Sequence, residues 1–297
     1  MRRTMLYLPG NNPNMLTRGH LFGSDGLVLD LEDAVSASEK DSARILIREV
    51  LKRGEFGDCE VTVRINGLDT EFWRDDLAAV VPYGLHGVRA PKVESPQTVK
   101  DLDEELSVVE SKWNIPVGRT KISCLLETAF GVWNAYEIAK SSPRVVAIIP
   151  GGEDLTADLR TNRSLEGTEL EWVRRMLIVA ARAAGVDALD TVFPRITDDE
   201  GLRREVEFVK QLGFDGKSVI HPNQIPIIHQ VYTPTEKEIE RALQIVEAAK
   251  DAAARGLGAV SVNGRMVDAP VVKRAEYTLV RAGLMGENGQ ADAGKRG

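Results

Sequence analysis

The sequence has few cysteines, no long apolar run and no block of basic residues, and each absence excludes a class of protein. Its 297 residues include two cysteines, Cys59 and Cys124, which give neither a disulfide framework nor a metal-binding spacing. No apolar run approaches the roughly 18 residues of a membrane span, and the N-terminal run before Pro9 is too short for a signal peptide. A net charge of -7 with scattered Lys and Arg argues against binding to nucleic acid. These features predict a soluble, cytoplasmic protein with reduced thiols.

Nucleotide-binding motifs are also missing. No dinucleotide-binding fingerprint opens any strand–helix unit. The stretch LGFDGKS (212–218) is similar to a phosphate-binding loop, but the position that needs glycine is Gln211, which excludes a Walker site. Two alternatives remain for Gly216 and Lys217: they bind a phosphate, or they turn the chain into the last strand.

Short apolar runs recur at a mean step of roughly 30 residues, the size of one strand-plus-helix repeat. The runs are Met5–Leu8, Leu27–Leu31, Val61–Ile65, Gly87–Ala90, Ile122–Leu126, Val145–Ile149, Thr191–Phe193 and Ser218–Ile220. Capped helical segments separate them, as at Ser95-Pro96. This rhythm predicts an α/β fold, a (β/α)₈ TIM barrel, with a doubly wound open sheet as the alternative.

A second region follows the last strand. Thr235 precedes a long helical segment, Asn263-Gly264 joins two short alternating runs as in a β-hairpin, and residues 271–284 predict a final helix. We therefore expect a catalytic barrel over residues 1–230 and a helix–hairpin–helix extension over 231–286 that serves as lid and oligomerisation element. The polar, Gly-rich tail over 287–297 is predicted to be disordered.

Polar side chains follow the strands at the end where barrel enzymes place their chemistry. They are Asp30, Glu32, Asp33, Arg64, Asn66, Lys92, Glu127, Glu153 and Asp154. Adjacent parallel strands lie about 4.8 Å apart, so Glu127 and Asp154 can reach one hard cation such as Mg²⁺. Glu32 and Asp33 would hold its water ligands, and Arg64 matches a substrate carboxylate. The alternatives are that these charges neutralise one another, or that Glu127 caps a helix and Asp154 is a solvated loop acid.

Ordered motifs along nearly the whole chain resemble the citrate lyase β-like aldolase family of acyl-thioester carbon–carbon lyases. The motifs are MLYLPGNNP (5–13), DLEDAV (30–35), VRIN (63–66), LLETAFGV (125–132), GGEDL (151–155), LGFDGKSVIHPNQI (212–225) and NGRMVDAPV (263–271). Within the family, LRTNRSLEGTEL (159–170) and the C-terminal segment resemble the β subunits of citrate lyase more than the free-standing enzymes.

The resemblance implies roles for individual residues. It implies Mg²⁺ bound by Glu127 and Asp154, with Glu32 and Asp33 as outer acids, and Arg64 on the oxo-acid part of the substrate. Asp268, which alone would be interpreted as a turn residue, matches a lid aspartate that transfers protons at the site of a neighbouring subunit. We also expect substrate contacts from Asn66, Lys92, Gly152 and Glu153, and cofactor contacts from Asn12, Gly216 and Lys217.

The resemblance also implies the reaction and the partners. The substrate would be a citryl thioester on an acyl carrier protein, cleaved to oxaloacetate and acetyl thioester by a homotrimer or homohexamer that works with citrate lyase α and γ subunits. Asn12 stands where many coenzyme-A-using relatives have arginine, which favours the carrier-linked substrate. His221 stands where some β subunits have asparagine. Gly152 stands where alanine is commoner, and we expect little effect from it. The alternatives are a stand-alone lyase for malyl-CoA, citramalyl-CoA or hydroxymethylglutaryl-CoA, and a non-catalytic binding or scaffold subunit.

Overall fold

The structure is a computed structural model that describes residues 1–286, so the tail predicted to be disordered lies outside the described residues. The chain divides into two compact units, one of residues 2–229 and one that begins at Gln230 and includes Met1. Among the described residues, none of the helices combines the length and apolar character needed to cross a membrane. Cys59 and Cys124 are both free and buried.

The first unit is a closed barrel of eight parallel strands in sequence order, which confirms the predicted (β/α)₈ fold. The strands are β1 (Thr4–Pro9), β2 (Gly26–Asp30), β3 (Glu60–Arg64), β4 (Gly87–Ala90), β5 (Lys121–Leu126), β6 (Val145–Pro150), β7 (Asp187–Asp190) and β8 (Gly216–Val219). β8 pairs with β1, where Val219 lies opposite Leu6, and this pairing closes the sheet and rules out the open alternative.

The seventh strand is not where the sequence predicted it. The apolar run Thr191–Phe193 follows the observed β7, whose sequence DALD begins and ends with an acid. Asp190 is nevertheless fully buried, because Arg174 and Lys217 pair with it inside the protein. A strand that is buried through ion pairs is not recognisable from its apolar residues. The prediction therefore placed the seventh strand at the next apolar run, Thr191–Phe193.

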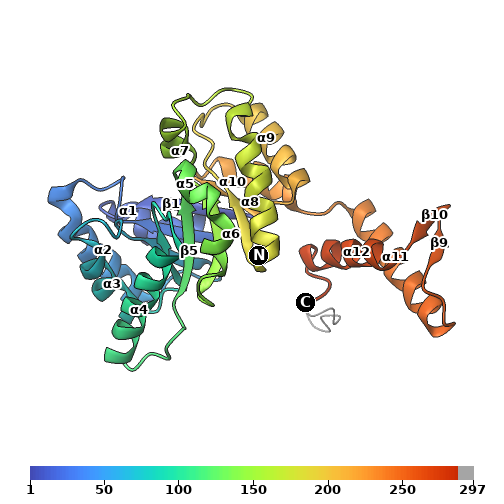
Figure 1. The fold of residues 1–297 in the computed structure, drawn as a ribbon, viewed down its shortest axis with the longest axis horizontal. Helices are drawn as coiled ribbons and strands as arrows, with labels where there is room; N and C mark the ends of the chain where they lie inside the picture. The colour runs from blue at the N-terminus through green and yellow to red at the C-terminus, as the bar shows by residue number, and fades with distance from the viewer. Residues whose placement is uncertain (287–297) are drawn as a thin grey trace. The chain divides into compact units, whose positions relative to one another are not determined.

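Helices surround the strands of the barrel (Figure 1). They are α1 (Pro13–Arg18), η1 (Gly19–Phe22), η2 (Ala37–Glu39), α2 (Lys40–Arg53), α3 (Trp73–Val80), η3 (Val81–Tyr83), α4 (Pro96–Lys112), α5 (Ala129–Trp133), α6 (Ala135–Lys140), α7 (Gly152–Asp158), η4 (Thr168–Leu170), α8 (Glu171–Ala184), α9 (Asp199–Leu212) and α10 (Gln224–Tyr232). Met5, Val28, Leu125, Ile149 and Leu189 fill the interior of the barrel. The packed interior leaves the strand ends as the place for polar side chains.

The second unit contains α11 (Glu236–Ala254), a hairpin of β9 (Val260–Val262) and β10 (Arg265–Val267), and α12 (Ala269–Arg281), in the predicted order. Thr235 and Glu238 form a capping box at the start of α11. Asn263 and Gly264 both have positive φ, as a two-residue hairpin turn requires.

Candidate active site

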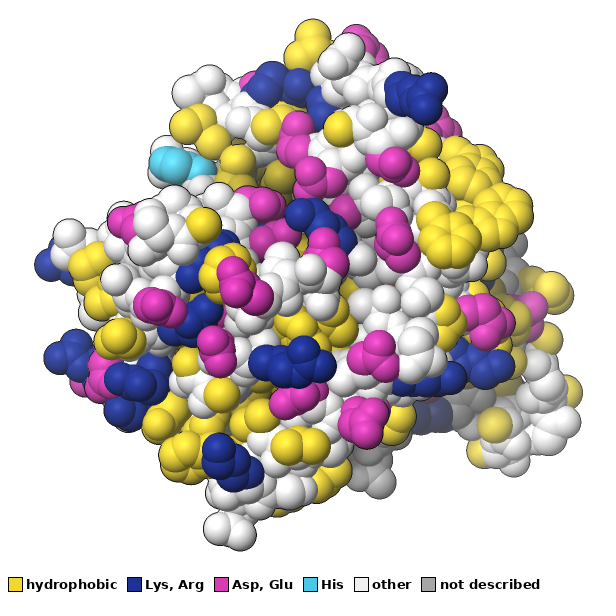
Figure 2. Space-filling view, turned by 60° about the vertical axis from the view of Figure 1, so that its left-hand side comes forward, with side chains coloured by type: hydrophobic (Ala, Val, Ile, Leu, Met, Phe, Trp, Pro, Cys, Tyr) yellow, Lys and Arg dark blue, Asp and Glu magenta, His cyan; other side chains and the backbone are white. Residues whose placement is uncertain are grey.

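A pocket of about 470 Å³ opens at the carboxyl ends of the barrel strands. Its charged residues and Thr191 lie at or just after the ends of five strands, and these are Asp30, Asp33, Arg64, Glu127, Glu153, Asp154 and Thr191. Gly151 and Gly152 complete the wall at the start of α7. The sequence therefore located most of the polar wall through the strand ends. The face drawn in Figure 2 carries acidic and basic side chains interspersed with one another.

Arg64 is held in a bidentate ion pair by Asp30. Its Nε donates to Asp30 Oδ1 at 2.7 Å and its Nη2 to Asp30 Oδ2 at 2.6 Å, with both residues buried. Burial lowers the pKa of Arg64, but the hydrogen bonds and charge of Asp30 outweigh it and raise that pKa further. The bidentate face predicted for a substrate carboxylate is thus occupied by Asp30, a residue that the sequence did not single out for this pairing.

The remaining nitrogen of Arg64 faces two further acids. Nη1 lies 2.8 Å from Glu32 Oε2 and 3.1 Å from Asp33 Oδ2. The Asp33 side chain is 59% exposed, whereas that of Glu32 is buried. A substrate carboxylate would therefore reach Arg64 most readily by taking the place of Asp33.

Glu127 is fixed by backbone contacts at the end of β5. Its Oε2 accepts a hydrogen bond from the backbone N of Lys92 at 2.8 Å. A Cβ at Gly151 would lie 2.2 Å from Glu127 Cγ, so the glycine is required for the carboxylate to lie flat against this loop. Burial raises the pKa of Glu127, the Lys92 hydrogen bond lowers it, and the charge of Asp154 raises it again.

Glu32 places a further carboxylate beside Arg64 and Glu127, although it is buried and does not itself line the pocket. Burial raises its pKa to about 7; Arg64 opposes this rise, while Asp33 and Glu127 add to it. Arg64 Nη1 and, at 3.3 Å, Lys92 Nζ are near enough for charge attraction, but neither oxygen of Glu32 has a hydrogen bond of good geometry. The orphaned buried oxygens and the mutual repulsion of these acids are features that a bound cation would relieve.

The donor set fits a hard cation with an incomplete protein shell. Among residues 1–286, no three or more His, Cys, Asp or Glu side chains form a group that could hold a metal. Glu127 and Asp154 nevertheless line one pocket, and Mg²⁺ is commonly bound by one or two carboxylates with water or substrate in the other positions. The residues present therefore fit Mg²⁺ with water or substrate in its remaining coordination positions. They do not fit a metal whose coordination positions are all filled by side chains.

Three other predicted residues are engaged in contacts of their own. Asn66 is buried and donates its Nδ2 to Asp76 Oδ2 at 2.7 Å, outside the pocket wall. Asn12 caps α1, its Oδ1 accepting from Met15 N at 3.2 Å. The backbone N–H of Lys92 donates to Glu127, and its Nζ forms an ion pair with Glu32.

Lys217 and Gly216 do not fit the predicted cofactor contact. Lys217 is 0% exposed, and its Nζ donates to Asp190 Oδ2 at 2.6 Å, Thr191 O at 2.7 Å and Glu205 Oε1 at 2.7 Å. These partners use every N–H donor of the ammonium group, so none is left for a phosphate. A Cβ at Gly216 would lie 1.8 Å from Arg2 O, so this glycine permits the close approach of two backbones. Both residues lie inside β8, as its first two positions, and not in a turn before it.

Asp268 belongs to the second unit, where it is the N-cap of α12 and its Oδ1 accepts from Val271 N at 3.2 Å. The barrel pocket takes all its lining residues from the first unit. The role of Asp268 in proton transfer stays a prediction. The local structure accounts for the residue as a helix cap.

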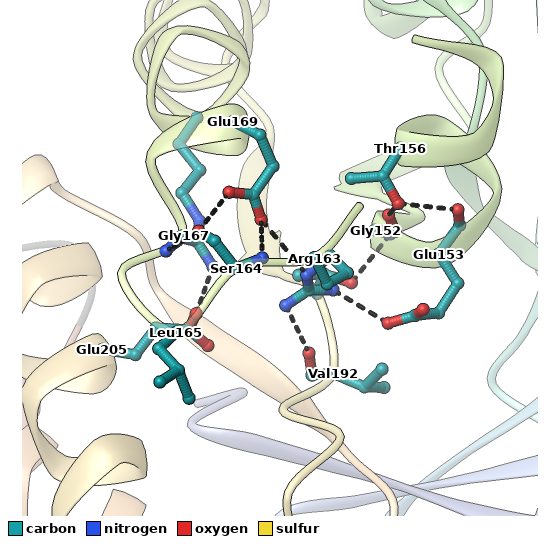
Figure 3. Close-up of polar contacts among 12 residues, drawn as sticks. Gly152, Glu153, Thr156, Arg163, Ser164, Leu165, Gly167, Glu169, Val192 and Glu205 are labelled. Carbon is teal, nitrogen blue, oxygen red and sulfur yellow. Dashed lines mark hydrogen bonds and ion pairs between the residues drawn. The ribbon is translucent and has the colours of Figure 1, made fainter. Parts of the chain in front are cut away.

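One basic residue beside the pocket escaped the sequence analysis. Arg163 contacts Glu153 and Val192, two residues of the pocket wall, from the loop after α7 (Figure 3). It does not follow a strand directly, and the segment 159–170 that contains it indicates a subgroup of the family without assigning it a role.

Comparisons with known proteins agree with this geometry. The sequence model of the HpcH/HpaI aldolase/citrate lyase family matches residues 3–222. Citrate lyase subunit beta of Leuconostoc mesenteroides subsp. cremoris is 47% identical over 279 residues, which are 94% of this chain and 92% of that protein. The (3S)-malyl-CoA thioesterase of Cereibacter sphaeroides is 34% identical over 280 residues, 94% of each chain. The crystal structure of protein CitE from Mycobacterium tuberculosis with magnesium, acetoacetate and coenzyme A is similar at a TM-score of 0.76 and 32% identity, covering 95% of this chain and 98% of that one.

Proposed function

Because the chain belongs to the HpcH/HpaI aldolase/citrate lyase family, we infer that it is a carbon–carbon lyase, and we propose that it acts as a citrate lyase β subunit. Its substrate would be a citryl thioester, cleaved to oxaloacetate and an acetyl thioester. The observation that carries this proposal is the 47% identity to a citrate lyase subunit beta over 94% of the chain. The pocket supports it with carboxylates and a buried arginine at the strand ends.

Magnesium is the cofactor that the residues accommodate. Glu127 and Asp154 would hold it, and Asp33 in the pocket wall and the buried Glu32 beside it would position its water ligands. The M. tuberculosis protein contains magnesium in its crystal structure. When bound, Mg²⁺ would supply a Lewis acid that stabilises negative charge on the substrate oxygens.

The chain's own residues would bind and orient the substrate. Arg64, fixed by Asp30, would present Nη1 to the oxo-acid half without reorganising, after Asp33 moves away. In the reaction the hydroxyl proton leaves and the carbon–carbon bond breaks. The bonding electrons pass to the thioester enolate, which takes up a proton. Asp268 is our candidate for one of these proton transfers.

The proposed partners follow from the same premise. We propose a homotrimer or homohexamer that works in the cytoplasm with citrate lyase α and γ subunits and receives its substrate on an acyl carrier protein. Asn12 supports the carrier, because it caps α1 and offers no cation to the phosphates of coenzyme A. The second candidate function is a stand-alone lyase for a coenzyme A thioester, favoured by the malyl-CoA thioesterase relative and by the coenzyme A in the M. tuberculosis structure.

One set of assays separates these functions. The purified protein with Mg²⁺ is given carrier-linked citryl thioester, citryl-CoA, malyl-CoA and (S)-citramalyl-CoA, and the release of oxaloacetate, glyoxylate and pyruvate is followed. Oxaloacetate release, fastest from the carrier, is the expected result. Glyoxylate or pyruvate as the main product would favour the stand-alone lyase, and no product from any substrate would favour a binding or scaffold subunit.

A matched pair of variants tests the metal site. Glu127→Gln removes one charge at the pocket, and Glu137→Gln removes one on the exposed face of α6. Mg²⁺ binding, followed by calorimetry, and turnover should both be lost only in the first variant. Equal Mg²⁺ affinity in the two variants would reject Glu127 as a ligand.

A further inference from the structure

Arg163 is a largely buried cation behind one wall of the pocket: it is not itself a lining residue, but it hydrogen-bonds to Glu153 and Val192, which are. It lies in the loop between α7 and η4, and its side chain is 10% exposed. Nη1 donates to Glu153 Oε1 at 3.2 Å and Nη2 to Val192 O at 3.4 Å. Nε makes no hydrogen bond, although Glu169 Oε1 lies 3.7 Å from it (Figure 3). A guanidinium has five N–H donors, and these contacts leave most of them without a partner of good geometry.

Such a buried cation is ready to accept another anion. Burial of a charge costs free energy unless hydrogen bonds and counter-charges compensate for it. Within residues 1–286, the carboxylate that hydrogen-bonds to Arg163 belongs to Glu153, whose side chain is 62% exposed and can move into solvent. A ligand carboxylate would therefore exchange with Glu153 without changing the net charge around the guanidinium.

Gly152 brings this guanidinium to the pocket wall. A Cβ at Gly152 would lie 2.3 Å from Arg163 Nη1 and 2.7 Å from Thr191 Oγ1, so the guanidinium occupies space that any other residue would fill. Gly152, Thr191 and Val192 all line the pocket. In the closed barrel this wall, at β6 and β7, lies across from β3, which carries Arg64.

The loop that carries Arg163 is itself well fixed. Ser164 donates its backbone N–H to Glu169 Oε1 at 3.1 Å and its hydroxyl to Glu169 Oε2 at 2.6 Å, and Gly167 N donates to Ser164 Oγ at 2.9 Å (Figure 3). A guanidinium on such a loop is positioned before a ligand arrives, which lowers the cost of ordering it.

We propose that Arg163 binds a second carboxylate on the oxo-acid half of the substrate and thereby determines specificity. This inference rests on the proposed function. Citryl thioester carries a carboxylate and a carboxymethyl group on its carbinol carbon, whereas citramalyl thioester has a methyl group in place of the latter. Asp30 occupies Nε and Nη2 of Arg64, which leaves Nη1 for one substrate carboxylate. The carboxymethyl group would then pair with Arg163.

The test compares ligands that differ by this one group. Binding of oxaloacetate and of pyruvate, each with Mg²⁺, is measured by calorimetry for the wild type, Arg163→Gln, Arg163→Lys and the control Arg175→Gln, which removes an exposed charge from α8. Loss of a charged hydrogen bond should weaken oxaloacetate binding by roughly 10- to 100-fold in Arg163→Gln. Pyruvate binding should stay unchanged, Arg163→Lys should recover part of the loss, and the control should match the wild type.

Glu153→Gln provides an independent test on an exposed side chain. It removes the carboxylate that competes for Nη1, so the ratio of oxaloacetate affinity to pyruvate affinity should rise. Equal loss of both ligands in Arg163→Gln would show that Arg163 only supports the Gly152 wall, and unchanged oxaloacetate binding in Arg163→Gln and Glu153→Gln would also overturn the proposal. If the wild type cleaves no citryl thioester but its preference for oxaloacetate depends on Arg163, the proposed function fails and this inference stands.

Discussion

Lys217→Met tests whether the buried lysine of β8 is a structural residue. The substitution keeps most of the side-chain volume and removes an ammonium group that is 0% exposed. It takes from Asp190 the partner at 2.6 Å and from Glu205 the partner at 2.7 Å, and leaves Arg174 to neutralise both acids. Removing one partner of a buried ion pair lowers the free energy of unfolding by about 3–5 kcal/mol.

That loss is large beside the total stability of a typical domain, about 5–15 kcal/mol. We expect the urea midpoint of Lys217→Met to fall with the slope unchanged, and Tm to fall by roughly 10 °C. Lys112→Met, at the exposed end of α4, serves as control. The KM for a coenzyme A thioester should stay the same in both variants. A loss below about 1 kcal/mol, together with a raised KM, would refute the buried network and restore Lys217 as a phosphate contact.

Three further predictions follow from other contacts. Burial alone would raise the pKa of Asp190, but the charges of Arg174 and Lys217 lower it to about 2, below the value of about 3.9 in an unfolded chain. The ionised Asp190 therefore stabilises the fold above pH 4, and this stabilisation is lost as the pH falls towards 2. The difference in free energy of unfolding between wild type and Lys217→Met should narrow over that interval in acid unfolding curves. A constant difference would contradict the lowered pKa of Asp190. Asp268→Asn should keep Mg²⁺ and substrate binding and the α12 cap but lose turnover, and full activity would reject its role in proton transfer. Gly152→Ala should weaken oxaloacetate binding by displacing the Arg163 guanidinium, contrary to the small effect expected from the sequence, and unchanged binding would show that the side chain moves aside freely.

The barrel was predictable because its strands are buried and apolar, and short apolar runs separated by capped helices leave a clear periodic signal. The one strand that was displaced in the prediction, β7, has acids at both ends, and its burial depends on Arg174 and Lys217 from other elements. A pairing between distant residues has no local pattern. Where burial is achieved through such pairs, hydrophobicity alone places an element wrongly.

The candidate site divides in the same way. Strand ends are set by topology, so Arg64, Glu127 and Asp154 reached one pocket as expected. The direction of a side chain depends on its neighbours in the fold. Asn66 points to Asp76, and Lys217 points into the core, where it binds Asp190. The sequence shows that a polar residue follows a strand, but only the packed structure shows which partners already occupy its hydrogen-bonding groups.

This distinction also explains why two arginines beside one pocket have different uses. Arg64 is bound on two nitrogens by buried Asp30, so it stays fixed and adds a constant positive potential to the site. Nη1 of Arg64, which faces the exposed Asp33, is left for the one carboxylate that all the candidate substrates share, so Arg64 does not distinguish among them. Among the described residues, Arg163 makes two long hydrogen bonds, one of them to the exposed Glu153, and an ion pair with Glu169 at 3.7 Å. The free energy of its guanidinium therefore depends on what replaces Glu153. Discrimination therefore belongs to the incompletely paired cation, and variants of Arg163 should change which substrate is used, whereas variants of Arg64 should lower turnover of every substrate.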